Sequence, residues 1–280
     1  MRIATPLATA LLVALLAGCQ QHPPANDQLD AVLWTQTSIE HDLLFRQVYA
    51  NATRQLDKAL ADPGWDALAE APRELAGLPP AVIVDIDETL LDNVPLNART
   101  ILEDRPYDYQ EWNQWVERAE ARALPGSVAF LQAAAQRGIT PYYLTNREPG
   151  QEQATLVNLR RAGFPIDDTA QILTAGTAIG GCADAGSDKT CRRHWVGSRA
   201  RVLMLVGDSF GDFIAGKGSL ADQQRVAAPY LGWLGERLFL LPNPTYGHWY
   251  SAPYQGREDL PASEKRALKQ RALQPQYPTY

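Results

Sequence analysis

Apolar residues recur along this chain with two spacings, one typical of helices and one typical of buried strands. Between Leu29 and about Leu60 they recur every three or four positions with few breakers, which predicts one long amphipathic helix or two. Further helices are predicted over residues 97–122, 127–136 and 151–162. The glycine-rich residues 174–191 predict an irregular loop, and the polar, proline-bearing tail from about Ser251 is expected on the surface.

Short apolar runs lie between the predicted helices and are typical of buried strands. The first run is Ala81 to Asp85, and it is rich in β-branched residues. Further strands are predicted over residues 139–144, 172–173, 201–206 and 238–241. Because strands and helices alternate, we predict an α/β fold with a mostly parallel sheet and flanking helices. In such sheets the functional residues lie at the carboxyl ends of the strands.

The first residues of the chain form a separate signal. One positive charge and an apolar run over residues 8–17 describe a secretory signal peptide, because the run is too short to span a bilayer. The sequence Leu16–Cys19 resembles a bacterial lipobox, in which the cysteine is lipidated; the alternative is an ordinary signal with a chance cysteine. We therefore predict a signal peptide over 1–18, a lipid on Cys19 and a tether over 19–28.

The cysteines and the residue after the lipobox refine this expectation. Gln20 stands where an Asp would favour retention at the inner membrane, so we expect a lipid anchor in the bacterial outer membrane, exposed to the periplasm or the surface. Lipidation of Cys19 leaves Cys182 and Cys191, nine positions apart. In an oxidising compartment this pair predicts a disulfide, with two free thiols as the alternative.

Composition narrows the classes of function. The chain has 280 residues, of which 45% are hydrophobic and 21% are charged, as in an ordinary globular protein. The formal net charge is −6, and no block of lysines or arginines offsets it. A nucleic-acid polymer is therefore not expected as a partner, because binding its backbone usually requires a basic face.

Chemistry-bearing side chains follow successive predicted strands. Asp85 and Asp87 follow the first, and two carboxylates at this spacing can divide nucleophilic attack and leaving-group protonation between them. An anionic phosphate monoester would be repelled by a bare carboxylate, so a divalent cation and a lysine are needed. Asp208 after a later strand offers a further metal oxygen, and Lys189 offers the positive charge. Thr145 offers a hydroxyl to the phosphoryl oxygens, and a set of oxygen ligands alone suits Mg²⁺.

Asp85 to Asn93 resembles the first motif of the haloacid dehalogenase (HAD) superfamily. The form D-x-D-E-T-x-L-D-N resembles that of the class C acid phosphatases, the bacterial outer-membrane lipoprotein 5′-nucleotidases. The resemblance extends over residues 32–40, 124–126, 143–147, 206–213 and 241–249. It implies a HAD-like Rossmannoid domain over 29–280 with a small helical cap inserted at about 93–124.

The resemblance also implies a role for each residue. Asp85 would form an aspartyl-phosphate, and Asp87 would protonate the leaving oxygen and then activate water. Thr145 would bind the phosphoryl oxygens, and Lys189 would neutralise the intermediate, although Arg192, Arg193 and Lys217 are other nearby cations. Mg²⁺ would be held by the Asp85 carboxylate, the Asp87 carbonyl and Asp208.

The expected substrate is a small phosphomonoester, most simply a nucleoside 5′-monophosphate. Asn146, Arg147 and Tyr246 are expected to bind it, and Tyr246 is a candidate stacking partner for the base. Aromatic residues of the cap offer further contacts with a base or, as the alternative, form the core of the cap: Tyr107, Tyr109, Trp112 and Trp115. The fourth motif departs from the family pattern, because Gly211 and Asp212 stand where two acidic residues are usual.

Competing functions remain at this point. A HAD dehalogenase would also use Asp85 but needs no acid at Asp87. A phosphotransferase would keep every motif, and a surface lipoprotein could bind a ligand without turnover. The expected partners are therefore the phosphomonoester, the membrane through the lipid, and a second copy of the chain as an alternative to a monomer.

Overall fold

The computed structural model describes residues 27–68, 73–176, 179, 182, 187–216 and 218–273. The predicted signal peptide, Cys19, most of the tether and Lys217 lie outside the described residues. Among the described helices, none is both long enough and apolar enough to cross a bilayer.

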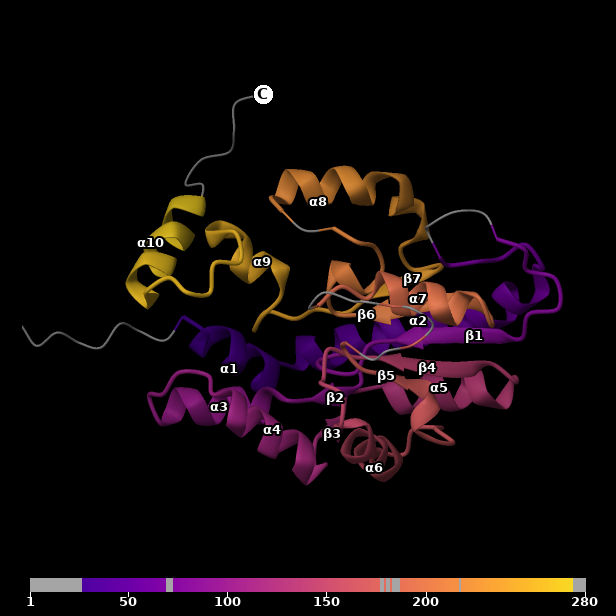
Figure 1. Cartoon of the computed structure of the whole chain (residues 1–280), viewed down its shortest axis with the longest axis horizontal. Coiled ribbons are helices and arrows are strands. Elements are labelled where there is room, and N and C mark those ends of the chain that lie inside the picture. Colours follow the sequence, from indigo (N-terminus) through magenta and orange to yellow (C-terminus); the bar gives the residue numbers. More distant parts are fainter. Residues whose placement is uncertain are drawn as a thin grey trace, which may run out of the picture.

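Five parallel strands form the central sheet, in the order β5-β4-β1-β6-β7 (Figure 1). The strands are β1 (Pro80–Val84), β4 (Thr140–Leu144), β5 (Ile172–Leu173), β6 (Arg201–Gly207) and β7 (Leu238–Leu240). This confirms the predicted α/β sheet. Strand β1 lies at the centre, with β4 on one side and β6 on the other, so the chain order reverses there. Such a reversal opens a crevice beyond the carboxyl ends of the strands.

Helices cover both faces of the sheet. They include α2 (Ile39–Ala61), α5 (Ser127–Gln136), α6 (Glu152–Ala162) and α7 (Thr190–Gly197). A further helix, α8 (Leu220–Ala227), follows β6 and has no residue in either core. Val82 and Val84 of β1 pack with α2, α5 and α6, whereas Ala81 and Ile83 pack in a second core with α7. The alternation explains why β1 is apolar at every position, because each of its faces is buried.

The first predicted helix is two helices. The shorter, α1 (Leu29–Thr37), ends before α2 because Ser38 is extended, with ψ 136°. The Ser38 hydroxyl accepts the backbone N–H of His41 at 3.1 Å and so caps α2.

The segment between β1 and α5 contains two helices and a small ribbon. The helices are α3 (Val94–Leu102) and α4 (Tyr109–Arg118), and β2 (Leu91–Asp92) pairs antiparallel with β3 (Arg122–Ala123). The continuous helix expected over 97–122 is therefore interrupted. A new helix begins because the Asp108 carboxylate accepts the backbone N–H of Glu111 at 3.0 Å.

Several helices were not predicted. Helix α7 begins inside the expected loop 174–191, and the tail contains α9 (His248–Ser251) and α10 (Ala262–Ala272). Short 3-10 turns are η1 (Thr169–Gln171), η2 (Phe210–Asp212), η3 (Ala228–Trp233) and η4 (Ala252–Tyr254). Helices α8 and α10 contain no fully buried residue, so they carry too little apolar periodicity to be recognised from the sequence.

A buried hydrogen bond between α2 and the loop after β1 can be tested. The Tyr49 hydroxyl donates to the carbonyl of Thr89 at 2.7 Å. Replacing Tyr49 by Phe leaves that buried carbonyl without this donor, so we expect a loss of about 1–2 kcal/mol in the free energy of unfolding. Chemical denaturation measures the change. Tyr142→Phe, at a half-buried ring packed against Trp195, is the control; an equal loss in both variants would contradict the assignment.

Candidate active site

The loop after β1 brings two carboxylates to the edge of the sheet. The backbone N–H of Asp85 donates to the carbonyl of Val206 in β6 at 2.9 Å, which extends the sheet by one bond. The chain then turns tightly, because the N–H groups of Leu90 and Leu91 both donate to Ile86, at 2.8 and 2.9 Å. Glu88 adopts the left-handed conformation, with φ 60°. For a non-glycine residue this conformation is costly and marks a tightly determined turn.

Three carboxylates meet around one lysine. Asp85, Asp208 and Asp212 each offer an oxygen, and these oxygens lie within 4.8 Å of one another. The ammonium of Lys189 forms an ion pair with Asp85 and lies 2.7 Å from an oxygen of Asp212. The hydroxyl of Thr89 lies 3.1 Å from oxygens of both Asp85 and Asp208. The structure therefore brings together three predicted residues, Asp85, Lys189 and Asp208, and adds Asp212.

Burial governs the protonation of this cluster. Desolvation raises the pKa of Asp85 well above its usual range, although Lys189 opposes the rise. Desolvation and the charge of Asp212 raise the pKa of Asp208 to about 7. Burial alone would lower the pKa of Lys189, but the carboxylates of Asp212 and Asp85 raise it, so the lysine remains charged.

This donor set fits a divalent cation. Three carboxylates against one ammonium leave a surplus of negative charge, and the ligand atoms that the three residues offer to a metal are all carboxylate oxygens. Hard cations such as Mg²⁺ take carboxylate oxygens as ligands. Asp85 and Asp208, both predicted ligands, are the residues that would hold it, with Asp212 beside them.

Asp87 lies in a different environment from Asp85. The guanidinium of Arg147 forms an ion pair with it at 2.8 Å, the hydroxyl of Thr145 donates to it at 2.9 Å, and the amide of Asn93 donates at 3.0 Å. The Arg147 side chain is fully buried and also donates to Thr155 at 3.0 Å. Arg147 was expected to bind substrate, but here it holds Asp87, as does Thr145. Their contacts with substrate stay predictions.

The other cations considered beside Lys189 have structural partners. Arg192 donates to the carbonyl of Thr145 at 2.6 Å and also to Asn146 at 3.3 Å, and Arg193 donates to the carbonyl of Gly211 at 3.1 Å. Both arginines are fully buried in α7. Of Lys189, Arg192 and Arg193, it is thus Lys189 that pairs with Asp85.

A disulfide joins Cys182 to Cys191, with their Cα atoms 5.6 Å apart. Cys191 lies in the first turn of α7, and Lys189 immediately precedes the first residue of this helix. The bridge therefore ties Cys182, which precedes Lys189 in the chain, to the first turn of the helix that follows this lysine.

Three contacts of the site were not predicted from the sequence, and they involve Glu88, Asn243 and the hydroxyl of Tyr246. The hydroxyl of Tyr246 donates to the buried carboxyl of Glu88, which also accepts the N–H of Asn93 at 2.8 Å. Desolvation and the nearby Asp87 charge raise the pKa of Glu88 to about 8. The amide of Asn243 donates to Asp208 at 2.8 Å. Asn243 comes soon after the carboxyl end of β7. It could therefore have been predicted in the same way as Asp208, which follows the carboxyl end of β6.

Gly211 makes room for a histidine from the tail. A Cβ atom at position 211 would lie 2.8 Å from Cε1 of His248, so an acidic residue at Gly211 would displace that ring. The glycine that replaces the expected acidic residue is therefore matched by the ring of His248, which occupies the space beside it.

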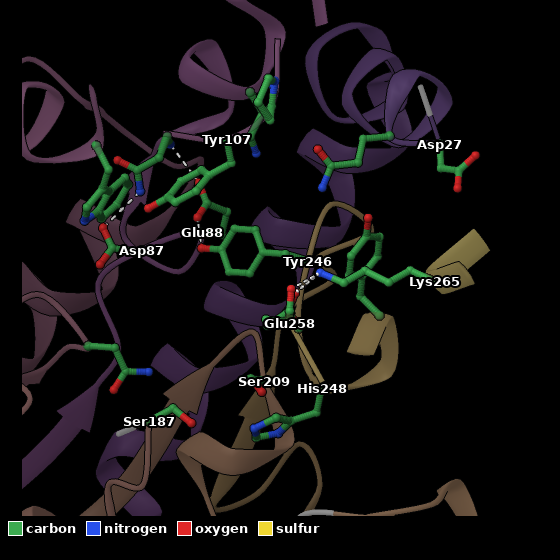
Figure 2. Close-up of a pocket in the computed structure, with 18 of the residues that line it drawn as sticks. Asp27, Asp87, Glu88, Tyr107, Ser187, Ser209, Tyr246, His248, Glu258 and Lys265 are labelled. Atoms are coloured by element: carbon green, nitrogen blue, oxygen red, sulfur yellow. Dashed lines mark hydrogen bonds and ion pairs between the residues drawn. The ribbon is translucent and has the colours of Figure 1, made fainter. Parts of the chain in front are cut away.

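A cavity of about 1030 Å³ opens beside these residues (Figure 2). Asp85, Asp87 and Asp208 line one end, and Tyr246 and Asn146 line its wall. Three of the predicted cap aromatics also line it, namely Tyr107, Tyr109 and Trp112. The fourth, Trp115, is half-buried, and its indole N–H donates to the side chain of Asn93 at 2.7 Å.

Comparison with known proteins gives concordant findings. The family model described as "HAD superfamily, subfamily IIIB (Acid phosphatase)" matches residues 19–249. The class C acid phosphatase from Bacillus anthracis is 33% identical, with a TM-score of 0.76 over 88% of this chain and 96% of that one. A second structure of that enzyme, with tungstate bound, is 32% identical, with the same TM-score and coverage. Acid phosphatase 1 from Solanum lycopersicum is 28% identical over 164 residues, which are 59% of this chain and 57% of the tomato protein. The matched region is thus less than two thirds of that relative.

The acidic cluster predicts a measurable response to metal. We expect Mg²⁺ at a concentration about a hundredfold above its Kd to raise the Tm by about 5 °C. The reason is that Mg²⁺ binds the folded chain, in which the carboxylates lie together, and not the unfolded chain. Asp208→Asn should abolish this shift. In EDTA the same variant should melt no lower than the wild type at pH 8, because a carboxyl whose pKa rises to about 7 on folding costs stability as pH rises from about 4 to 7.

Asp57→Asn is the control for this experiment, since Asp57 lies on the surface and pairs with Arg137. The control should keep the full Mg²⁺ shift. An unchanged shift in Asp208→Asn would contradict the metal site.

Proposed function

The chain belongs to the acid phosphatases of HAD subfamily IIIB, and from this premise we propose that it hydrolyses phosphomonoesters in a Mg²⁺-dependent reaction. One observation carries the proposal: two carboxylates two positions apart in the sequence lie in separate environments with different partners. Asp85 lies against Lys189 in the acidic cluster, and Asp87 is held outside it by Arg147. This arrangement suits one carboxylate for attack and the other for proton transfer.

In the first step an oxygen of Asp85 attacks phosphorus, and the bond from phosphorus to the ester oxygen breaks. Asp87 gives its proton to the departing oxygen. The resulting aspartyl-phosphate is hydrolysed when Asp87 takes a proton from water and the water oxygen attacks phosphorus, which releases phosphate and restores Asp85.

The remaining residues provide charge and position. Lys189, already beside Asp85, offsets the negative charge that gathers on the phosphoryl oxygens. Bound Mg²⁺ would supply further positive charge to those oxygens. The Thr145 hydroxyl donates to Asp87 in this structure. We propose that it donates to the phosphoryl group when substrate is bound. One relative's structure holds tungstate, an oxyanion with the tetrahedral shape of phosphate.

We propose nucleoside 5′-monophosphates as the substrate class. The cavity is lined beyond the carboxylates by Tyr107, Trp112 and Tyr246, whose rings offer flat apolar faces. Tyr246 is 37% exposed although its hydroxyl is held by Glu88, so the ring is fixed in place and still accessible. A fixed aromatic ring binds a base with little loss of side-chain entropy.

We also propose that the protein is held to the outer membrane by a lipid on Cys19, as the lipobox-like sequence predicts. Wild-type protein expressed in a Gram-negative host should enter the detergent phase of an extract, whereas Cys19→Ser should enter the aqueous phase. Partition of both into the aqueous phase would refute the anchor. Association of two chains stays a prediction, which light scattering of the solubilised protein tests.

The catalytic assignment predicts strong losses from single substitutions. We expect Asp85→Asn to reduce phosphate release by a factor of about 10⁴ or more, because the nucleophile is lost. Asp87→Asn should lose about 10²–10³, because only proton transfer is impaired, and an aspartyl-phosphate should accumulate. Phosphate release is measured over a panel of nucleotides, an alkyl phosphate and a phosphodiester, with and without EDTA.

Asp57→Asn again controls for folding, and the wild type should lose its activity in EDTA. Full activity in EDTA, or in folded Asp85→Asn, would overturn the mechanism. Equal kcat/KM values for the alkyl phosphate and the nucleotides would refute the nucleotide preference alone.

The disulfide predicts a separate effect on catalysis. Cys182→Ser with Cys191→Ser should cost about 2–3 kcal/mol of stability, because a loop of ten residues is released in the unfolded chain. We expect kcat/KM to fall in addition by about tenfold at temperatures where the variant is folded, because Lys189 is then less well positioned. Mass spectrometry of the unreduced protein counts free thiols, and unchanged kinetics in the double variant would refute the catalytic part.

A further inference from the structure

The cavity continues well beyond the proposed catalytic residues. Figure 2 shows Asp87 on one side, Tyr246 near the middle, and Lys265 and Asp27 on the far side. Its volume of about 1030 Å³ is at the upper end for small-ligand sites, which span roughly 300–1,000 Å³. The far side is formed by α10, whose residues line the cavity along most of the helix. A nucleoside monophosphate bound at Asp85 would leave that side unused.

The two ends of the cavity carry opposite charge. The lining residues at the catalytic end include five acidic and two basic side chains: Asp85, Asp87, Glu88, Asp208 and Asp212 against Lys189 and Arg147. The lining residues at the α10 end include three basic and two acidic side chains: Lys265, Arg266 and Lys269 against Glu258 and Asp27. Cations therefore exceed the carboxylates that pair with them by one at the end remote from the nucleophile, in a chain whose net charge is −6.

Two lysines of α10 are fixed by neighbouring tyrosines. The ammonium of Lys269 lies 3.4 Å from the centre of the Tyr250 ring, and that of Lys265 lies 5.4 Å from the Tyr254 ring. Lys265 also pairs with Glu258 at 2.7 Å, and the ammonium of Lys269 lies 4.0 Å from a carboxylate oxygen of Asp27, which also pairs with Arg266. Both lysine side chains are about four-fifths buried, with 21% and 22% exposed. Partly desolvated and held in place, they bind an anion with less loss of entropy than mobile surface lysines would.

We propose that the α10 end of the cavity is a second anion subsite, which binds a phosphate separated from the scissile phosphate by a nucleoside. The inference rests on the proposed function, because it deepens the choice of substrate at the same site. The terminal phosphomonoester lies at Asp85, the first nucleoside lies along Tyr246, and the next phosphate reaches Lys265 and Lys269. The proposed substrate class is a nucleoside 5′-phosphate that carries a further phosphate group on the side of the nucleoside away from the scissile phosphate. A nucleotide without that group does not reach the α10 end of the cavity.

The test compares two substrates with the same terminal phosphate. AMP is the unextended substrate, and the dinucleotide pApA carries a phosphodiester and a second adenosine beyond the first. The wild type is expected to hydrolyse pApA with a kcat/KM at least fivefold above that for AMP. Lys265→Gln with Lys269→Gln should lower the ratio of pApA to AMP by about tenfold, because two fixed charges are lost. The change should lie in KM, and Lys265→Arg with Lys269→Arg should restore most of it.

Lys58 of α2, which does not line the cavity, offers a control. It also pairs with a glutamate, Glu236 at 3.2 Å, and its ammonium lies 5.2 Å from the Trp65 ring. Lys58→Gln should leave the ratio of pApA to AMP unchanged. A wild-type preference for AMP, or the same ratio in the double glutamine variant as in the wild type, would overturn the subsite.

Binding separates this inference from the proposed function. Calorimetric titration of Asp85→Asn with pApA and with AMP measures affinity without turnover, in the presence of Mg²⁺. Tighter binding of pApA, lost on adding the two glutamine substitutions, supports the subsite even where no phosphate is released. Equal affinities would overturn the subsite even where the enzyme hydrolyses nucleotides well.

Discussion

The crowding of buried carboxylates at the end of β1 and β6 is the constraint on which the rest of this structure depends. Asp85, Asp208 and Asp212 approach one another closely at the end of the cavity, where the first and last are buried, and one lysine opposes them. Such a cluster is stable only if its charge is neutralised or its oxygens are bonded. Asn243 and Thr89 supply such bonds, and burial together with the neighbouring carboxylates raises the pKa values of Asp85 and Asp208. A cation site is the simplest outcome of this constraint.

Close approach of the backbone is the second requirement. A Cβ atom at Gly207 would lie 2.3 Å from an oxygen of Asp212, so any other residue at the end of β6 would push this carboxylate away. Asp212 in turn accepts the N–H of Ser209 at 2.9 Å, which closes a short turn on the strand end. The glycine is thus explained by the position of a carboxylate five residues later.

The position of β1 connects these local requirements to the whole fold. Because β1 lies between β4 and β6, its carboxyl end is adjacent to Thr145 on one side and Asp208 on the other. The segment after β7 then crosses the same edge and brings Tyr246 to Glu88. The tail continues into α10, which extends the cavity beyond the carboxylates of the sheet edge.

The sequence by itself determined the sheet, the paired aspartates and the carboxyl ends on which the site would lie, because each depends on a short-range pattern. Apolar runs identify buried strands, and parallel strands align their carboxyl ends. Only the tertiary structure decided which cation faces Asp85, what holds Asp87, and that α10 forms a wall of the cavity. Lys189 lies 104 positions from Asp85, and Arg147 lies 60 positions from Asp87. Lys189, Arg192 and Arg193 look alike in the sequence, but the start of α7 directs the first to the carboxylates and the other two to backbone carbonyls. Their environments are created by contacts between distant segments, and those contacts leave no local pattern in the chain.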